Sequence, residues 1–283
     1  MGITRAILVV LGLFLDLSSA FQPLRRDVHL TRNHLAALER PSDKQDDTPG
    51  IILPVFPLRK TVRLPTEPLT LNLYEDRYLQ MAEYILRQPT DRQIFGAMYA
   101  SNKPQIVRDG GLGPIVPILE VGDVGVVFII THSEEALIPT VGSDPRRRIR
   151  LVGVGSMRFK IRKIIENGYC ASDPSDNGSS DNLPFILVEA SLVQNDKLSP
   201  SEEAQFERLV QEIGVDNESK QRLEALTSKS EKIFHSVMEV EGPSLKADLM
   251  SFNICSSRVG EGETQKRLEL LTNIDLLDRL RAF

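Results

Sequence analysis

The stretch Leu53-Pro54-Val55-Phe56-Pro57-Leu58-Arg59 gives the clearest indication of the fold. It is a short apolar run, which is typical of a β-strand. Pro54 and Pro57 fix φ and lack an N–H donor, so we expect them at a strand start or a sheet edge. The side chains predicted to fill the core are Leu53, Val55, Phe56 and Leu58.

Short strands separated by Gly, Pro, Asn and Asp are predicted downstream. Leu69, Leu71 and Leu73 alternate with other residues, which is the period of a half-buried strand. Further apolar or β-branched runs cover residues 94–100, 124–131, 148–154, 157–165 and 184–193. One amphipathic helix over residues 74–88 interrupts them and is ended by Pro89. The pattern predicts a closed or nearly closed β architecture.

The period changes to helical near residue 198. Ser199-Pro200-Ser201-Glu202 has the arrangement of a capping box with Pro at the first helical position, so a helix is expected to begin there and to close at Gly214. A second helix, residues 223–238, is expected to stop at Gly242-Pro243. Shorter helices are expected over residues 245–254 and 264–282. The predicted fold class is therefore α+β, with strands first and a four-helix subdomain after them.

Several motifs now resemble one family. Leu53 to Arg59, Leu64-Pro65 and the segment Pro68-Leu69-Thr70-Leu71-Asn72-Leu73-Tyr74-Glu75-Asp76-Arg77-Tyr78 resemble the opening of the Lon protease N-terminal domain. In its stand-alone branch that opening runs close to LPLFPL, FPG and LPLxIFEPRY. Residues 152–161 are similar to its G-x-x-R-F-x-I strand pair, and residues 246–249 and 265–271 to its closing helices. The resemblance implies a PUA-like β-barrel (residues 51–195) followed by a helical bundle (residues 196–283).

The sequence also departs from the family pattern. Thr66-Glu67 stands where the family has Gly after Pro65, and Asp76 replaces the Pro of the E-P-R-Y element. Gly reaches positive φ without steric cost and Thr does not, so we expect the turn after Pro65 to differ in shape. Ser156-Met157 lies inside the strand-pair signature.

Two groups of residues are candidates for binding a partner. Glu75, Arg77 and Tyr78 fall at a predicted helix start, where a carboxylate suits the positive helix end and the arginine can pair with it or with the backbone. Arg146-Arg147-Arg148 follows Asp144-Pro145 and is expected to project charge at a loop end. The alternative for the first group is a purely structural role. For the second it is a solvated rim, an acidic-peptide contact or an RNA contact.

Catalytic motifs are not evident. The chain has no G-x-x-x-x-G-K-[ST] phosphate loop, and Gly110-Gly111-Leu112-Gly113-Pro114 is predicted to be a mobile turn. The two cysteines, Cys170 and Cys255, have no companions at metal-ligand spacing, and no His is placed beside them as a base. We expect no enzyme, no cofactor and no metal. A cryptic hydrolase is the third alternative for function.

The first 50 residues have the character of a targeting segment. Arg5 precedes an apolar run that ends at the small residues Ser18-Ser19-Ala20, as in a cleaved signal peptide of residues 1–20. A permanent anchor is the alternative, although a membrane span needs about 20 apolar residues. Residues 21–50 are rich in arginine, and Ala20-Phe21 resembles the bipartite plastid presequence of diatoms. Plastid localisation is expected, with the secretory pathway as the alternative and no membrane association of the mature form.

The resemblance implies a non-catalytic module that recognises exposed segments of client proteins or docks to a proteolytic or quality-control machine. An RNA-binding PUA-like protein is the alternative. The formal net charge of -5 makes nucleic acid an unlikely partner, because no global basic field attracts phosphates. Only five residues, 194–198, join the two predicted parts, so we expect the β part and the helices to pack together.

Overall fold

The computed structural model describes residues 50–106, 112–140, 143–167, 183–193, 195, 198–235, 242–273 and 275–281. The predicted signal and transit segments up to residue 49, the Gly110-Gly111 turn and Cys170 lie outside these ranges. The strands and helices described below all belong to one compact unit, Pro41–Phe283.

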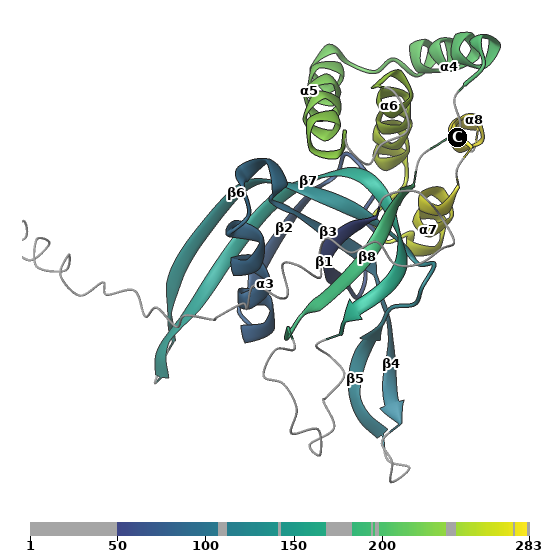
Figure 1. Ribbon diagram of the computed structural model, residues 1–283. Helices are drawn as coiled ribbons and strands as arrows, with labels where there is room; N and C mark the ends of the chain where they lie inside the picture. Colours follow the sequence, from purple (N-terminus) through teal and green to yellow (C-terminus); the bar gives the residue numbers. More distant parts are fainter. Residues whose placement is uncertain are drawn as a thin grey trace, which may run out of the picture. The chain divides into compact units, whose positions relative to one another are not determined.

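Strands come first along the chain and helices last, which confirms the mixed α+β class (Figure 1). The strands are β1 Ile51–Leu58, β2 Pro68–Leu73, β3 Ile94–Tyr99, β4 Ser101–Ile106, β5 Leu112–Ile118, β6 Val124–Thr140, β7 Ser143–Glu166 and β8 Ile186–Val193. A helix, α3 Asp76–Leu86, and a 3-10 turn, Thr90–Arg92, interrupt them. The later helices are α4 Pro200–Ile213, α5 Asn217–Phe234, α6 Gly242–Arg258, α7 Thr264–Thr272 and α8 Leu276–Arg281.

The main sheet has the order β2-β7-β6-β3-β1-β8, and β7 also pairs with β8. The pairings thus run from β7 through β6, β3, β1 and β8 back to β7. This is possible because β7 is 24 residues long: one segment pairs with β2, and a later one, from Arg158 on, pairs with β8. The prediction of two separate strands, residues 148–154 and 157–165, was wrong. Gly153, Gly155 and Ser156 lie inside one continuous strand.

The first strand shows how the sheet tolerates its two prolines. β1 lies between β8 and β3, not at an edge as expected. It pairs with β8 only over Ile51 to Val55, and with β3 only over Val55 to Leu58. Pro54 therefore faces a partner on one side only, and so does Pro57. A proline has no N–H to donate. On the side where β1 has no strand partner, this causes no loss of a ladder hydrogen bond.

The turn between β1 and β2 keeps the shape that glycine would give it. Thr66 has φ +74°, and the Glu67 N–H donates to the Leu64 carbonyl at 3.3 Å, which closes a turn with Pro65 as its first central residue. Thr66 also donates to the Gly155 carbonyl at 2.9 Å. The expectation that Thr66 would change this turn was wrong, because docking against β7 holds it in the left-handed region.

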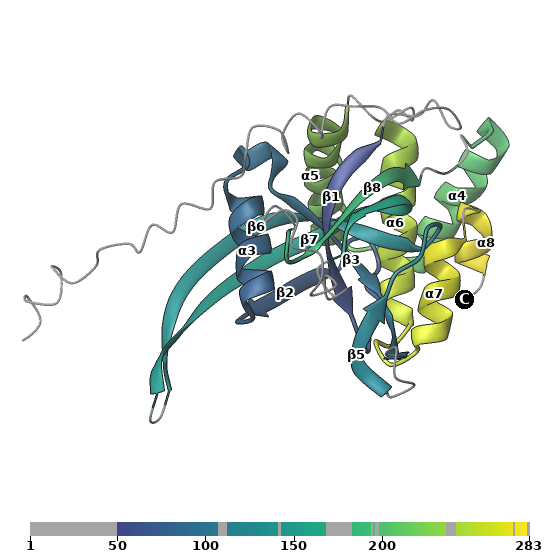
Figure 2. The same cartoon turned by 60° about the horizontal axis from the view of Figure 1, so that its bottom comes forward.

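A two-stranded extension of the sheet projects beyond its neighbours. β6 and β7 pair from Val124 with Lys160 out to Thr140 with Ser143, whereas β3 accompanies β6 only as far as Ile129 and β2 accompanies β7 only over Ile149 to Val154. We call residues 131–140 and 143–150 the arm. In Figure 2 the arm and α3 lie on one side, and the C-terminal helices gather on the other.

The helical part begins as predicted and then differs. Ser199 and Glu202 form a complete capping box, Pro200 opens α4, and Gly214 closes it at φ +76°. Gly242-Pro243, expected to stop the second helix, instead lie at the start of α6, and α5 ends earlier at Phe234. The last predicted helix is two, because Asn273 has an extended backbone between α7 and α8.

Strands and helices share their core. Val55 and Phe159 of the strands lie in one buried cluster with Leu223 and Phe234 of α5 and Leu249 of α6. A buried hydrogen bond of 2.6 Å also joins the hydroxyls of Ser156 on β7 and Ser230 on α5. These contacts agree with the expectation that the two parts pack together. None of the helices in the described ranges is long and apolar enough to cross a membrane.

Candidate functional site

The first candidate surface is a hollow between the start of α3 and the arm, which we call the arm hollow. Its volume is about 600 Å³, and it is lined by Tyr74, Glu75, Asp76, Arg77, Leu79, Arg146 and Arg147. Four of the six residues predicted to bind a partner thus come together here. Tyr78 lies beneath them, 8% exposed, with its ring 4.7 Å from that of Phe56. Phe56 is itself only half-buried, because it packs on α3 and not in the sheet interior.

The charges of the arm hollow are largely paired with one another. Arg77 lies 3.1 Å from Glu75, the N-cap residue of α3, so the expected carboxylate stands at the helix start and pairs with Arg77, without a side-chain hydrogen bond to the helix backbone. Arg147 binds both Glu83 of α3 and Glu135 of β6. Hydrogen bonding to Arg147 lowers the pKa of Glu135 and holds it ionised.

The three consecutive arginines have different surroundings. Arg146 and Arg147 line the hollow, whereas Arg148 does not and lies 3.8 Å from Glu134. These arginines lie near the start of β7, which begins at Ser143. Since Arg147 and Arg148 are both neutralised by carboxylates, the arm presents a mixed surface and not a basic one.

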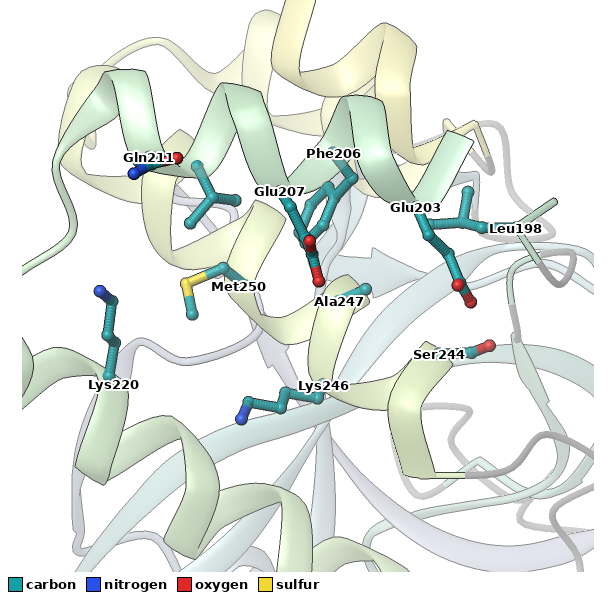
Figure 3. A pocket seen from close by; sticks show the side chains of 11 residues that line it. Leu198, Glu203, Phe206, Glu207, Gln211, Lys220, Ser244, Lys246, Ala247 and Met250 are labelled. Atoms are coloured by element: carbon teal, nitrogen blue, oxygen red, sulfur yellow. The ribbon is translucent and has the colours of Figure 1, made fainter. Parts of the chain in front are cut away.

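The second candidate surface is a groove between α4, α5 and α6, which we call the helix groove (Figure 3). It has a volume of about 570 Å³, within the range of about 300–1,000 Å³ that is usual for ligand sites. Its apolar lining comes from Leu198, Phe206, Val210, Ala247 and Met250, and its polar lining from Glu203, Glu207, Gln211, Lys220, Ser244 and Lys246.

The helix groove was not foreseen because its apolar residues also fit a buried core. Phe206 and Val210 have the 3.6-residue spacing of a core-facing stripe, yet no residue of α4 is buried. Phe206 and Val210 are half-buried and form the inner face of α4, opposite Met250 of α6. The sequence did contain one signal for the groove. α4 carries many charged residues and only a narrow apolar stripe, and a stripe of that width covers only part of the apolar surface on which the helix lies.

The rim of the helix groove is charged. Glu203 and Glu207 lie one turn apart on α4, and Lys220 of α5 lies on the other side. Within the described ranges, these three side chains have no ion pair. Lys246, by contrast, binds Glu224 at 2.8 Å and lowers the pKa of that carboxyl by the hydrogen bond.

No nucleophile and base are brought together among the residues that the structure describes. His132 is exposed on the arm and His235 is exposed at the end of α5. Cys255 is buried in α6, where desolvation raises the pKa of its thiol to about 11. Over the same ranges, no group of three or more His, Cys, Asp or Glu side chains could hold a metal ion.

Comparisons with known proteins point in one direction. A family model described as the ATP-dependent protease La (LON) substrate-binding domain matches residues 52–283. The chain is similar to the crystal structure of a Lon N-terminal domain protein from Xanthomonas campestris, with 20% identity, a TM-score of 0.42, and coverage of 82% of this chain and 95% of that one. It is also similar to the N-terminal domain of Mycobacterium avium complex Lon protease, with 19% identity, a TM-score of 0.39 and the same two coverages. No curated protein sequence matches.

Proposed function

The chain belongs to the family of Lon protease substrate-binding domains, and from that premise we propose that it is a non-catalytic module that recognises exposed segments of other proteins. It binds such segments as clients, or docks through them to a proteolytic or quality-control machine. In this proposal the helices that follow a PUA-like arrangement of strands supply the binding surface.

The observation that carries the proposal is the open, apolar helix groove. Phe206 and Val210 of α4 and Met250 of α6 line a hollow of about 570 Å³. Apolar side chains that line a hollow open to water bind another apolar surface favourably, because binding removes them from water. Met250 is unbranched and can adapt its shape to different ligands.

RNA binding, the alternative expected from a PUA-like fold, receives less support. Nucleic acid binding depends on unpaired basic side chains that replace counterions along the phosphates. Arg147 is paired with two carboxylates, and Arg148 and Arg150 both lie 3.8 Å from Glu134. The net charge of the chain is -5.

Binding of an unfolded protein by the whole chain tests the proposal. The probe is a labelled model protein, kept unfolded by reduction and carboxymethylation, with its native form as the reference. We expect binding of the unfolded form only, loss of binding in Val210→Asp, and little change in Leu137→Asp. Leu137 is a matched apolar control, exposed on the arm. Equal binding by both variants, or loss only in Leu137→Asp, places recognition elsewhere.

Two further parts of the proposal concern chemistry and place. The whole chain should neither hydrolyse ATP nor cleave the unfolded probe. Turnover that persists through purification and disappears in Cys170→Ala or His132→Ala contradicts this. A fluorescent protein fused behind residues 1–50 should enter plastids of a diatom. Signal in the secretory pathway, with glycosylation at Asn177 of the N-x-S pattern Asn177-Gly178-Ser179, contradicts the plastid assignment.

A further inference from the structure

We infer that the segments held in the helix groove are amphipathic helices with basic residues along one flank. This inference rests on the proposed function and names the class of segment that the groove selects. It follows from the rim charges, the apolar lining and the length of α4.

The two carboxylates of the acidic wall have no basic partner in the described part of the chain. Glu203 and Glu207 are exposed on α4, one turn apart, and neither forms an ion pair there. Like charges four residues apart destabilise a helix. Their neighbour Glu202 is different, since it accepts hydrogen bonds from the backbone and hydroxyl of Ser199 in the capping box. A lysine or arginine of a ligand that lies between Glu203 and Glu207 removes the repulsion and gains two charge-assisted contacts.

The opposite wall carries the opposite charge. Lys220 lines the groove from α5 and is exposed, whereas Lys246 is already bound to Glu224. Figure 3 shows Glu203 and Glu207 on the α4 side and Lys220 and Lys246 across from them. The two walls therefore favour a ligand with a basic flank toward α4, and they disfavour the same ligand turned around.

The apolar lining fits the apolar stripe of a helix. Phe206 and Val210 are separated by one turn of α4, and Ala247 and Met250 by about one turn of α6. A ligand helix that lies along α4 presents apolar side chains at positions i, i+3 or i+4 into this hollow. α4 has 14 residues, a length of about 21 Å, so about four turns of ligand can run beside it.

α4 forms one wall of the groove at the surface of the helical part. It has no buried residue, and its ends are defined by the Ser199 cap and by Gly214 in the left-handed region. A long-range contact of α4 in the described ranges joins Gln205 to Arg281 of α8 at 3.4 Å. Phe206, Leu209, Val210 and Ile213 pack, partly buried, against the core cluster, so they hold α4 in place as one wall of the groove.

Three synthetic peptides of about 15 residues test the inference by fluorescence anisotropy with the whole chain. The first is an amphipathic helix with a leucine stripe and a lysine flank. The second has every lysine replaced by glutamate. The third has the composition of the first in an order that destroys the stripe. We expect the first to bind about fivefold or more tightly than either of the others, with a preference that weakens as salt increases.

Charge variants of α4 make the test specific. Glu203→Gln with Glu207→Gln should remove the preference for lysine over glutamate, and Glu203→Lys with Glu207→Lys should reverse it. Glu212→Gln is the matched control, because Glu212 is exposed on the same helix and does not line the groove. Far-ultraviolet dichroism checks that each variant keeps its helices. Lysine and glutamate peptides that bind equally, or a reversal that fails in a folded variant, overturn the inference.

The outcomes separate this inference from the function on which it rests. If Val210→Asp abolishes binding of every peptide and the flank charges have no effect, the groove binds protein segments but does not select basic helices. If none of the peptides and no unfolded protein binds, both proposals fail. Sedimentation of the chain alone detects a second copy as the occupant, and dimers that Val210→Asp dissociates also overturn the inference.

Discussion

The guanidinium of Arg158 on β7 donates a hydrogen bond of 3.0 Å to the carbonyl of Leu271 at the end of α7. Arg158 is fully buried. It also donates to the Asn195 side chain at 2.5 Å, and Asn195 donates in turn to Asp248 of α6 at 2.6 Å. Asp248 also binds Arg279 of α8. One polar network therefore connects a strand, the connection after β8 and three helices.

Arg158 is predicted to couple the unfolding of strands and helices. Burial lowers its pKa to about 10, so it remains charged at neutral pH. Arg158→Met leaves its acceptors without a donor and should cost about 3–5 kcal/mol of unfolding free energy. Arg150→Met is the exposed control on the same strand and should cost less than about 1 kcal/mol.

The measurement is denaturant unfolding of the whole chain, followed by far-ultraviolet dichroism and by limited proteolysis. One transition is expected in both variants, moved to lower denaturant in Arg158→Met. Two separate transitions, of which Arg158→Met changes only the helical one, would show that strands and helices are independent.

Thr66 is predicted to limit stability. Its φ of +74° is unfavourable for a β-branched residue and free of steric cost for glycine. Thr66→Gly should raise the free energy of unfolding by about 0.5–1 kcal/mol, since relief of strain exceeds the added entropy of the unfolded chain. Thr70→Gly on β2, which has no positive φ, should lower it. The idea fails if thermal unfolding shows both substitutions to be equally destabilising.

Two phenylalanines of the helical part, Phe252 and Phe206, are predicted to differ in their contribution to stability. Phe252 is fully buried between Arg158 and Arg279, whose guanidinium carbons lie 5.2 and 4.2 Å from its ring centre. Phe252→Ala should cost about 3–5 kcal/mol. Phe206 is only half-buried in the helix groove, so Phe206→Ala should cost about 1–2 kcal/mol. Denaturant midpoints compare the two, and equal losses would place Phe206 in the core.

Cys255 is predicted to be inert while the protein is folded. Its thiol pKa is raised to about 11 by burial, and only the thiolate reacts with alkylating reagents. At neutral pH the thiolate fraction is therefore lower than that of an ordinary cysteine, in addition to the block on access. In a Cys170→Ser variant, iodoacetamide should label the chain only after denaturant is added. Rapid labelling of the native chain would contradict the burial of Cys255.

Local patterns identified much of the fold. The alternation at Leu69, Leu71 and Leu73 and the Ser199 capping box depend on neighbouring residues, and both predictions are confirmed. The continuity of β7 was missed, because Gly153 and Gly155 indicate a break locally. In the fold they allow close approach: a Cβ on Gly155 meets the Leu64 carbonyl at 3.0 Å. The turn at Thr66 makes that contact, and it lies 89 residues before Gly155 in the sequence, so the local pattern around Gly155 does not reveal it.

The candidate sites could be predicted only in part. Glu75, Arg77 and the arginines of the arm were identified by their charge, and the pairing of β2 with β7 brings them together. Tyr78 is buried, which agrees with the structural role that was the alternative for this group, and its burial depends on the position of Phe56 in β1. The helix groove depends on the distance between α4 and α6. The periodicity of each helix does not determine that distance.

Site-specific photo-crosslinking tests the recognition of protein segments at the helix groove most directly. A benzophenone amino acid takes the place of Phe206 in one version of the whole chain and of Tyr74, in the arm hollow, in another. Each is irradiated with the unfolded model protein in the presence of RNA. We predict crosslinks from position 206 to the protein probe, suppressed by an excess of the lysine-flanked peptide. Crosslinks from position 74 alone, or to RNA alone, would contradict the assignment of the helix groove as a site for protein segments.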